Sequence, residues 1–478
     1  MRARMIWPAC FASGAATGMC LLFPKVGSAV FFLPIPALMV LLRQTESRRT
    51  FKLCAVFCLG MCMAAYAPAF SIRPAVDESL VFWIDLGVYL AICVIHGLLF
   101  TTGLWCGLRL PCPNALRWLA VAAFWTLAER LCGAGPLAWP TLQLSLALWQ
   151  YPALMQGARW GGHLLISALI MGVNVLLCQG FAKPPCRRRL PALLGAVLLF
   201  SGNVSLYIFA PSLPQPDTKI AVVQPGMKGI GEERADLYDK ALTLAEEAAA
   251  RQPSLILLPK GVLPSFFGSS EMMQAQWGSI AKTTGADLLA GGIDEGRSTV
   301  FHFGADSGLL QLYHKRRQVP FFENGDRGTS FSWQVDNRAG ILTSQKGKAG
   351  VVICYKSMFA PMTHYAAKED AKLLLVLTND SWFDSDAAKR IHLAHGVYRA
   401  VETGRSLVQA GLNGYTAVID IQGHLTCILP ANQPGVLESE VSFAPQDTLY
   451  LRWGDGWLFL ILVLLLANGV RFKYMTKQ

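Results

Sequence analysis

Cys354 is the residue whose type and place in the sequence most directly suggest chemistry. It follows a short apolar run, Val351 to Ile353, that is typical of a buried strand, and it opens into a turn. A cysteine at a strand end lies where an α/β fold presents a nucleophile. A free cysteine is also commonly a small buried hydrophobe without a chemical role. The residues that follow other strands favour the nucleophile.

Two lysines lie at the ends of other predicted strands. Lys260 closes the strand over 255–258, and Lys315 follows a hairpin-like region over 299–313. Strand ends of this kind converge on one cleft in an α/β fold, and nearby ammonium groups favour the thiolate form of a cysteine. A single strand-end lysine is more often a solvated surface charge. Three polar strand ends together favour a functional cleft.

The segment 211–451 has the composition of an ordinary soluble domain, and its predicted strands and helices alternate. We expect strands over 219–223, 255–258, 287–291, 351–353, 373–377, 407–411 and 416–420, and helices over 232–252, 271–285 and 387–405. This alternation predicts a layered α/β sandwich around a largely buried sheet.

The rest of the chain is much more apolar. The 478 residues are 53% hydrophobic and only 15% charged, whereas soluble chains have about 25% charged residues. Apolar stretches lie at 7–23, 26–42, 51–70, 80–106, 115–131, 161–180, 190–210 and 453–470. Most reach the roughly 17–25 residues that a helix needs to cross a bilayer. The fifth is the weakest, because Glu129 and Arg130 stand at its end, and the first could instead be a cleavable signal peptide.

Basic residues predict the orientation of these eight spans, because cytoplasmic loops carry an excess of Lys and Arg. One set of alternate loops contains Arg2, Arg4, Arg43, Arg48, Arg49, Lys52, Arg109, Arg117, Lys183, Arg187, Arg188, Arg189, Arg471, Lys473 and Lys477. The other contains only Lys25, Arg73, Arg130, Arg159 and Arg452. Both termini are therefore expected in the cytoplasm and 211–451 outside it. The net charge of +11 follows partly from this topology, so we expect no nucleic-acid binding, and the basic loops favour anionic lipid head groups.

The cysteines and histidines of the 211–451 segment have simple interpretations. It contains two of the 13 cysteines, Cys354 and Cys427. They could pair in an oxidising compartment, but a disulfide would consume the nucleophile, so we expect none. His392 and His395 are three residues apart on a predicted helix. Without a third ligand they are better read as core or helix-face residues than as a metal pair.

These features together resemble the nitrilase superfamily, and eight spans with an outward domain before the last one resemble the apolipoprotein N-acyltransferases. The motifs that carry the resemblance are at 221–226, 257–264, 313–323, 350–355, 378–383 and 399–405, with 125–129 and 152–156 in the apolar half. The resemblance implies a polytopic α-helical membrane domain plus an α/β nitrilase-like (αββα sandwich) extracytoplasmic domain. We expect seven transmembrane helices in 1–210, a carbon–nitrogen hydrolase domain in 211–451, and a final transmembrane helix with a cytoplasmic tail in 452–478.

Members of this family move an acyl chain from a phospholipid to the N-terminal amine of a diacylated lipoprotein, through a cysteine thioester. By resemblance Cys354 is the nucleophile, Lys315 stabilises the oxyanion, and Glu323 helps to shape the pocket. The other residues expected at the pocket are Tyr355, Lys356, Asn379 and Trp382. Trp382 is expected to pack beneath the cleft. No metal or dissociable cofactor is implied.

The sequence departs from the family at two positions. Lys260 stands where the family has its general-base glutamate, and Lys356 stands where it has glutamate two residues after the cysteine. Three lysines near one thiol would lower one another's pKa and that of Cys354. A lysine could take over as the base, the domain could bind lipid or lipoprotein without turnover, or the extra lysines could recognise an anionic group on a different donor or acceptor.

The expected function is therefore N-acylation of lipoproteins at the cell membrane, with a phospholipid as the acyl donor. The alternative from another class is a catalytically silent homologue that binds lipid or lipoprotein. A soluble-type amidase or nitrilase activity ranks third, because a small polar amide would not need eight spans.

Overall fold

The computed structural model describes residues 5–68, 78–135, 138–181, 189–227, 234–306, 308–315 and 338–475. The chain forms two compact units, which we call the helical unit and the α/β unit. The helical unit comprises Met1–Phe70, Asp77–Ala210 and Arg452–Gln478, and the α/β unit consists mainly of Pro211–Leu451.

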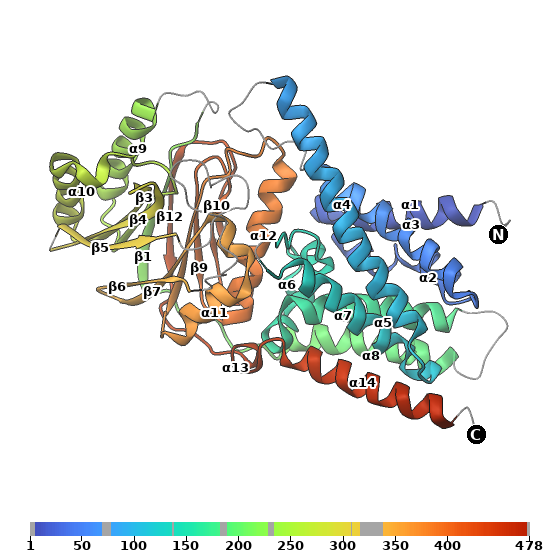
Figure 1. Ribbon diagram of the computed structural model, residues 1–478. Coiled ribbons are helices and arrows are strands. Elements are labelled where there is room, and N and C mark those ends of the chain that lie inside the picture. Colours follow the sequence, from blue (N-terminus) through green and yellow to red (C-terminus); the bar gives the residue numbers. More distant parts are fainter. Residues whose placement is uncertain are drawn as a thin grey trace. The chain divides into compact units, whose positions relative to one another are not determined.

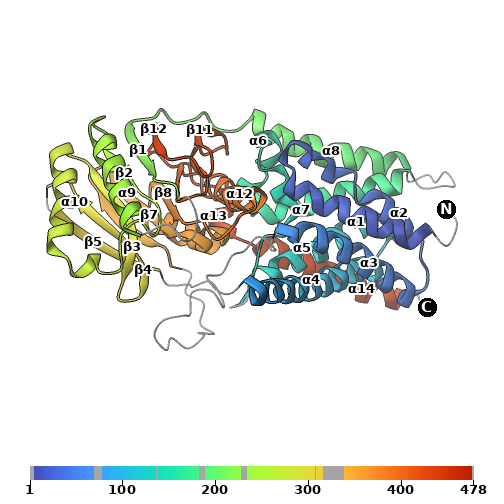
Figure 2. The same cartoon turned by 90° about the horizontal axis from the view of Figure 1, so that it is seen from above.

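The helical unit is built from long apolar helices that lie alongside one another (Figures 1 and 2). The long helices are α1 (Ile6–Leu22), α3 (Ser47–Tyr66), α4 (Glu78–Arg109), α5 (Arg117–Cys132), α7 (Ala158–Gly180), α8 (Arg189–Ile208) and α14 (Gly456–Met475), and two short ones are α2 (Ile35–Leu41) and α6 (Pro152–Met155). Within the described residues, six helical segments are long and apolar enough to cross a membrane. They are Pro24–Leu41, Ser47–Tyr66, Leu86–Arg109, Ala158–Gly180, Arg189–Ile208 and Gly456–Met475.

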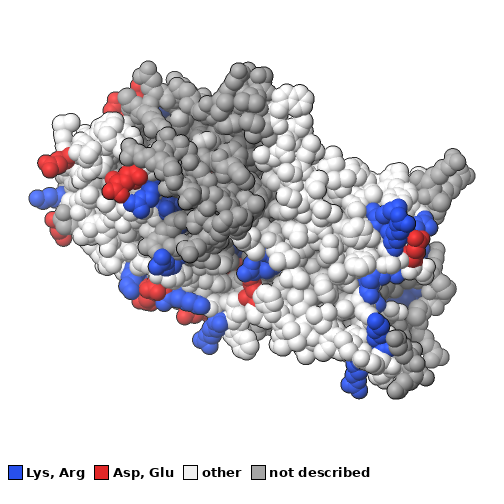
Figure 3. Space-filling model, viewed as in Figure 1, with Lys and Arg blue, Asp and Glu red and all other residues white. Residues whose placement is uncertain are grey.

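The two remaining apolar stretches of the sequence form shorter helices, α1 with 17 residues and α5 with 16. All eight predicted stretches are thus largely helical, and the number that cross the membrane stays a prediction. Large apolar side chains of α8 and α14 face outward, among them Leu194, Val197, Leu460 and Val463. On the face seen in Figure 3, the helical unit has a band largely without charged residues, with Lys and Arg gathered toward its end. These are the features of a multi-pass membrane protein, since lipid covers such surfaces.

Small residues and a few polar contacts join the helices. A Cβ atom at Gly14 or Gly18 of α1 would run into the backbone carbonyl oxygen of Phe57 or Met61 on α3, so glycine allows this close approach. Arg130 at the end of α5 forms an ion pair with Asp455, just before α14, at 2.7 Å.

The α/β unit contains two six-stranded sheets in its described residues. One sheet has the order β12-β1-β2-β3-β4-β5 and the other β11-β10-β9-β8-β7-β6. The first comprises β12 (Gly435–Val441), β1 (Thr218–Gln224), β2 (Leu255–Leu257), β3 (Asp287–Asp294), β4 (Arg297–Gly304) and β5 (Gly308–His314). The second comprises β11 (Leu425–Leu429), β10 (Thr416–Ile419), β9 (Leu407–Gly411), β8 (Leu373–Thr378), β7 (Gly347–Ile353) and β6 (Gly340–Ser344).

Alternating side chains of each strand build the layers. On β1, Ile220 and Val222 pack with residues of the second sheet, such as Val351 and Leu375, in the core between the sheets. The intervening Ala221 and Val223 pack with α9 (Arg234–Ala249) and α10 (Glu271–Thr284). Helices α11 (Ala360–Lys368) and α12 (Asp386–Thr403) follow β7 and β8 of the other sheet. The predicted αββα sandwich is confirmed, as are all seven predicted strands.

Candidate active site

Cys354 lies directly after β7 and begins a short 3-10 turn, Cys354–Met358. Its backbone φ is 52°, in the left-handed region that non-glycine residues rarely occupy. Such strained residues cluster at functional sites, at a cost of about 1–3 kcal/mol each. The side chain is half-buried, and Sγ lies 4.0 Å from the carbonyl oxygen of Asn379, which follows the neighbouring parallel strand β8. Cys354 and Cys427 are both free thiols, as predicted.

Lys260 follows β2 in a turn that is held against the neighbouring strand β3. The carbonyl oxygen of Gly291 on β3 accepts hydrogen bonds from the backbone N–H groups of Gly261, Val262 and Leu263, at 3.0–3.1 Å. A Cβ atom at Gly291 would lie 2.5 Å from the Cα atom of Lys260. Glycine on β3 therefore lets this turn approach closely enough to fix the position of Lys260.

Lys315 follows β5 and is buried, and its backbone N–H donates to the carbonyl oxygen of Ser298 at 2.7 Å. Lys260 and Lys315 both act on the Cys354 thiol. Burial raises the pKa of this thiol, but the positive charges of Lys260, Lys315 and His392 outweigh burial, so the pKa of Cys354 is lowered overall. The arrangement therefore favours a thiolate, the form of cysteine that attacks carbonyl groups.

Lys356 has a tyrosine as a close partner. It is fully buried, and its Nζ atom donates to the hydroxyl oxygen of Tyr313 on β5 at 3.1 Å. The same atom lies 5.5 Å from the centre of the Tyr313 ring, within the range of a cation–π contact. The expectation that Lys356 lies in the pocket near the thiol stays a prediction. The third cation acting on Cys354 is His392.

The remaining predicted pocket residues have different surroundings. Tyr355 is buried and packs edge-to-face against Phe359, with 4.9 Å between ring centres. The Asn379 side-chain oxygen accepts hydrogen bonds from the backbone and the hydroxyl of Ser381, which fixes the turn after β8. Trp382 is 37% exposed, so the prediction that it packs beneath the cleft is wrong, because the turn after β8 directs its side chain outward. Glu323 lies outside the described residues.

The sequence analysis missed a buried ion pair behind the Cys354 turn. His392 on α12 places Nδ1 2.8 Å from Oδ1 of Asp380 and Nε2 2.9 Å from the hydroxyl oxygen of Ser357, which lies three residues after Cys354. Thr378 donates its hydroxyl to the same Asp380 oxygen at 2.8 Å. His392, Asp380 and Ser357 are essentially inaccessible to solvent. His392 is therefore a core residue of α12, as predicted, but with a polar partner on each ring nitrogen.

At neutral pH both members of the pair are charged, His392 positively and Asp380 negatively. Burial lowers the pKa of His392, but the Asp380 carboxylate, assisted by Cys354, raises it to about 9. Burial likewise raises the pKa of Asp380, yet the neighbouring His392 and the Thr378 hydroxyl lower it overall. The one sequence signal for this pair was an aspartate at the end of a strand followed, 12 residues later, by a histidine on the next helix.

Both halves of the chain match known protein families. Residues 219–445 match the family described as Carbon-nitrogen hydrolase, and residues 15–176 match the Apolipoprotein N-acyltransferase N-terminal domain. An apolipoprotein N-acyltransferase of Thermotoga maritima is 24% identical over 473 residues, covering 95% of this chain and 90% of that protein. Another, from Gloeobacter violaceus, is 27% identical and covers 98% of this chain and 94% of that protein.

Among solved structures, an amidase from Nesterenkonia sp. is 21% identical and has a TM-score of 0.41, covering 52% of this chain and 98% of its own. Because the N-terminal match, the hydrolase match and the full-length relatives agree in order and extent along the sequence, the chain belongs to the apolipoprotein N-acyltransferase family.

Proposed function

We propose that this protein transfers an acyl chain from a phospholipid, through a thioester on Cys354, to the N-terminal amine of a lipoprotein. The observation that carries the proposal is the half-buried Cys354 in a left-handed turn, with Lys260, Lys315 and His392 lowering its pKa. The family of both halves of the chain supports the same reaction class. A catalytically silent role is not favoured, since Cys354 and the cations that activate a thiol are all present.

In the first half-reaction the Cys354 thiolate attacks the ester carbonyl of the phospholipid. The new bond joins Sγ to the acyl carbon, the ester C–O bond breaks, and the lysophospholipid leaves after its alkoxide takes up a proton, which the Lys260 ammonium is proposed to donate. The Lys315 ammonium is proposed to stabilise the oxyanion of the tetrahedral intermediate. A thiolate that is already formed needs no general base to attack, so this step tolerates the absence of a glutamate at position 260.

In the second half-reaction the lipoprotein amine attacks the thioester. A C–N bond forms, the C–S bond breaks, and the Cys354 thiolate is restored, while the amine loses a proton. An α-amino group has a pKa of about 7.7–8.0, so a useful fraction of the acceptor is already neutral near physiological pH. Lys260, at the position of the family's base, is proposed to be neutral at this stage because it has given its proton to the leaving alkoxide. It then accepts the proton that the amine loses, which restores its ammonium form. A general base contributes about 10²–10⁴ in rate, so this step is expected to limit turnover.

The organisation of the chain is part of the proposal. Residues 1–210 form a membrane domain of seven transmembrane helices, 211–451 form the catalytic domain outside the cytoplasm, and 452–478 add the last helix and a cytoplasmic tail. The positive-inside bias of the loops supports this orientation.

Intact-protein mass spectrometry after incubation with phospholipid vesicles tests the first half-reaction. We expect an acyl mass on the wild-type protein that hydroxylamine removes and that is absent from Cys354→Ala. Adding a peptide with a diacylated N-terminal cysteine should then discharge the adduct. An unmodified wild-type protein, under conditions in which Lys260→Glu becomes acylated, would show that the lysine has silenced the enzyme.

A further inference from the structure

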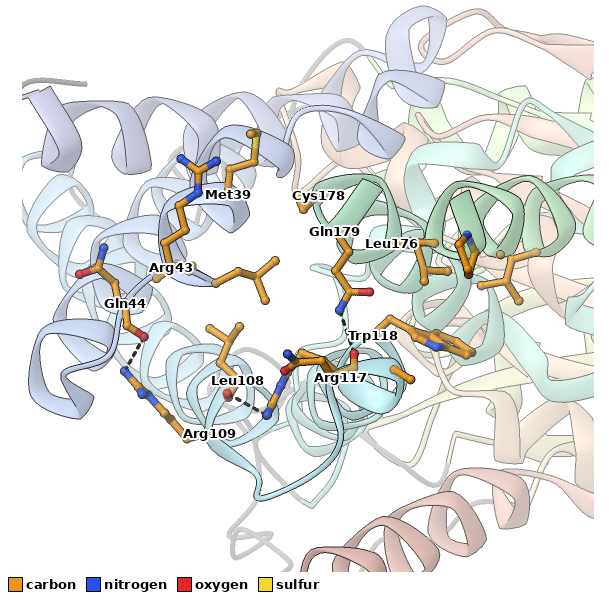
Figure 4. Close-up of a pocket in the computed structure, with 18 of the residues that line it drawn as sticks. Met39, Arg43, Gln44, Leu108, Arg109, Arg117, Trp118, Leu176, Cys178 and Gln179 are labelled. Carbon is orange, nitrogen blue, oxygen red and sulfur yellow. Dashed lines mark hydrogen bonds between the residues drawn. The ribbon is translucent and has the colours of Figure 1, made fainter. Parts of the chain in front are cut away.

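The helical unit contains a cavity of about 860 Å³ that the acyl-transfer site does not use (Figure 4). Its walls come from the C-terminal ends of α2, α4 and α7 and from the N-terminal parts of α5 and α8. Cavities of roughly 300–1,000 Å³ are typical of ligand sites. All the lining residues belong to the helical unit, whereas Cys354 and its cations belong to the α/β unit.

One end of this cavity is basic. Among the described residues, its lining includes Arg43, Arg109 and Arg117 but no aspartate or glutamate. Arg109 and Arg117 donate to backbone carbonyl groups, for example those of Thr45 and Leu110, at 2.8 and 2.7 Å. These contacts fix the two guanidinium groups without neutralising them. Arg43 is exposed, and its backbone N–H donates to the carbonyl oxygen of Val40. Its guanidinium group makes no hydrogen bond or ion pair with the described part of the chain, so no described carboxylate balances its charge.

The other end of the cavity is apolar and extends along α8. Ala192, Gly195 and Leu199 lie on one face of this helix, spaced three and four residues apart, and span about 10 Å along its axis. A Cβ atom at Gly195 would meet only the Leu176 side chain of α7, in ordinary contact at 3.5 Å or more, so a small side chain fits at this position, whereas a large one would enter the cavity. The neighbouring lining residue Leu198 is one of the exposed apolar side chains. The cavity thus joins a cationic end to an apolar channel between helices.

We propose that this cavity holds an anionic glycerophospholipid, with its phosphate at Arg43 and one acyl chain between α7 and α8. Basic pockets between transmembrane helices on the cytoplasmic side bind anionic head groups, and the loops at this end belong to the predicted cytoplasmic set. A small anion would leave the apolar channel empty, and a zwitterionic lipid would leave the charge of the three arginines unmatched. This bound lipid stabilises the helical unit and is distinct from the acyl donor, so the inference does not depend on the proposed reaction.

Lipid retention tests the head-group end. The purified full-length protein is exchanged into an equimolar mixture of phosphatidylglycerol and phosphatidylethanolamine with the same acyl chains, and bound lipid is measured by native mass spectrometry. We expect preferential retention of phosphatidylglycerol, reduced about fivefold by Arg43→Gln. Arg48→Gln is the matched control, because it removes an exposed arginine five residues away that does not line the cavity.

A second pair of variants tests the acyl channel. Gly195→Phe fills the space between α7 and α8 and should lower retention of both lipids, whereas Gly202→Phe, where a Cβ atom meets nothing within 4 Å, should not. Equal retention of the two lipids by the wild type, or equal effects within either pair of variants, would overturn the proposal. Thermal protection by inorganic phosphate alone, as large as that by phosphatidylglycerol, would show a small-anion site instead.

Discussion

At the scale of single residues, the charges around Cys354 explain how its thiol can react. A glutamate would accept the thiol proton, whereas an ammonium group lowers the free energy of the thiolate directly. Lys260 therefore stabilises the thiolate by its charge and does not need to accept the thiol proton. The Asp380 carboxylate opposes this effect, because its negative charge raises the pKa of Cys354. Its ion-pair partner His392 acts in the other direction and lowers the pKa of Cys354.

The three cations should differ in their effect on the Cys354 pKa. Lys260 has the largest lowering effect, followed by Lys315 and then His392. We expect Lys260→Gln, Lys315→Gln and His392→Gln each to raise the pH midpoint of Cys354 alkylation. The rise should be largest for Lys260→Gln and smallest for His392→Gln. The rate of iodoacetamide modification between pH 5 and 10, followed by mass spectrometry, measures each midpoint. Lys372→Gln, which removes a surface lysine paired with Asp370, should leave the midpoint unchanged. A midpoint that does not move in Lys260→Gln would contradict the order.

The His392–Asp380 pair should also make stability depend on pH. The pKa of His392 is raised in the folded protein to about 9, from about 6.5 in an unfolded chain. Its stabilising contribution is therefore fully present below pH 6.5 and is lost as the pH rises through 9. We expect the difference in thermal stability between wild type and His392→Gln to shrink over this range.

His424→Gln serves as the control for this comparison. His424 also lies 2.8 Å from an aspartate, Asp420, but its side chain is 35% exposed. Solvent screens such a pair, so its removal should change stability little at any pH. A constant difference between wild type and His392→Gln from pH 6 to 10 would show that the pair is not charged in the folded protein.

Residue types at strand ends were the part of the site that the sequence could predict. Cys354, Lys260 and Lys315 each follow an apolar run, and the ends of such strands meet in one region. His392 could not be found in this way, because its position depends on how α12 packs against the turn after β7. Trp382 was misplaced for a similar reason, since an aromatic residue in a turn carries no pattern that shows which way it faces.

At the scale of elements, local periodicity predicted the strands that run through buried positions. It did not predict β6, β11 or β12, whose burial patterns are mixed. β12 pairs antiparallel with β1, more than 200 residues earlier, with Thr218 opposite Val441. A pairing of this kind depends on closure of the whole unit and not on any local signal, so the order of the strands was not predicted from the sequence.

The turn that carries Lys260 should be sensitive to Gly291 on β3. In Gly291→Ala the new Cβ atom would lie 2.5 Å from the Lys260 Cα atom and 2.6 Å from the Pro259 carbonyl oxygen, so the turn must shift. We expect a loss of stability of about 1–3 kcal/mol and slower formation of the acyl-Cys354 adduct. Thermal unfolding and the mass-spectrometric acylation assay measure the two effects.

Gly435→Ala is the matched control for this turn. Gly435 lies on β12 of the same sheet, where a Cβ atom would make only ordinary contacts of 3.6 Å or more with Leu429. It should leave both measurements nearly unchanged. If Gly291→Ala and Gly435→Ala had the same thermal stability and the same rate of Cys354 acylation, the turn would accommodate the new Cβ atom without displacing the Lys260 side chain.

At the scale of the whole molecule, the question is how the two units are arranged across the membrane. Fifteen basic residues near one set of loops, against five near the other, predict cytoplasmic termini and an outer α/β unit. The count of spans depends on two short helices, α1 and α5, which have only 17 and 16 residues. At 1.5 Å per residue these helices are about 25 Å long, against a hydrocarbon core of about 30 Å.

Reporter fusions decide both points. Alkaline phosphatase, which is active only outside the cytoplasm, should be active when fused after residue 213 and inactive when fused after residue 478, because α14 lies between them. A protease-sensitive tag at the N-terminus should be protected from protease added outside intact cells. If either α1 or α5, but not both, fails to cross, only six spans precede residue 213 and the tag is cleaved from outside. Phosphatase activity after residue 478 would instead reverse the orientation, and would place Cys354 on the cytoplasmic side, away from the acceptor amine of an exported lipoprotein.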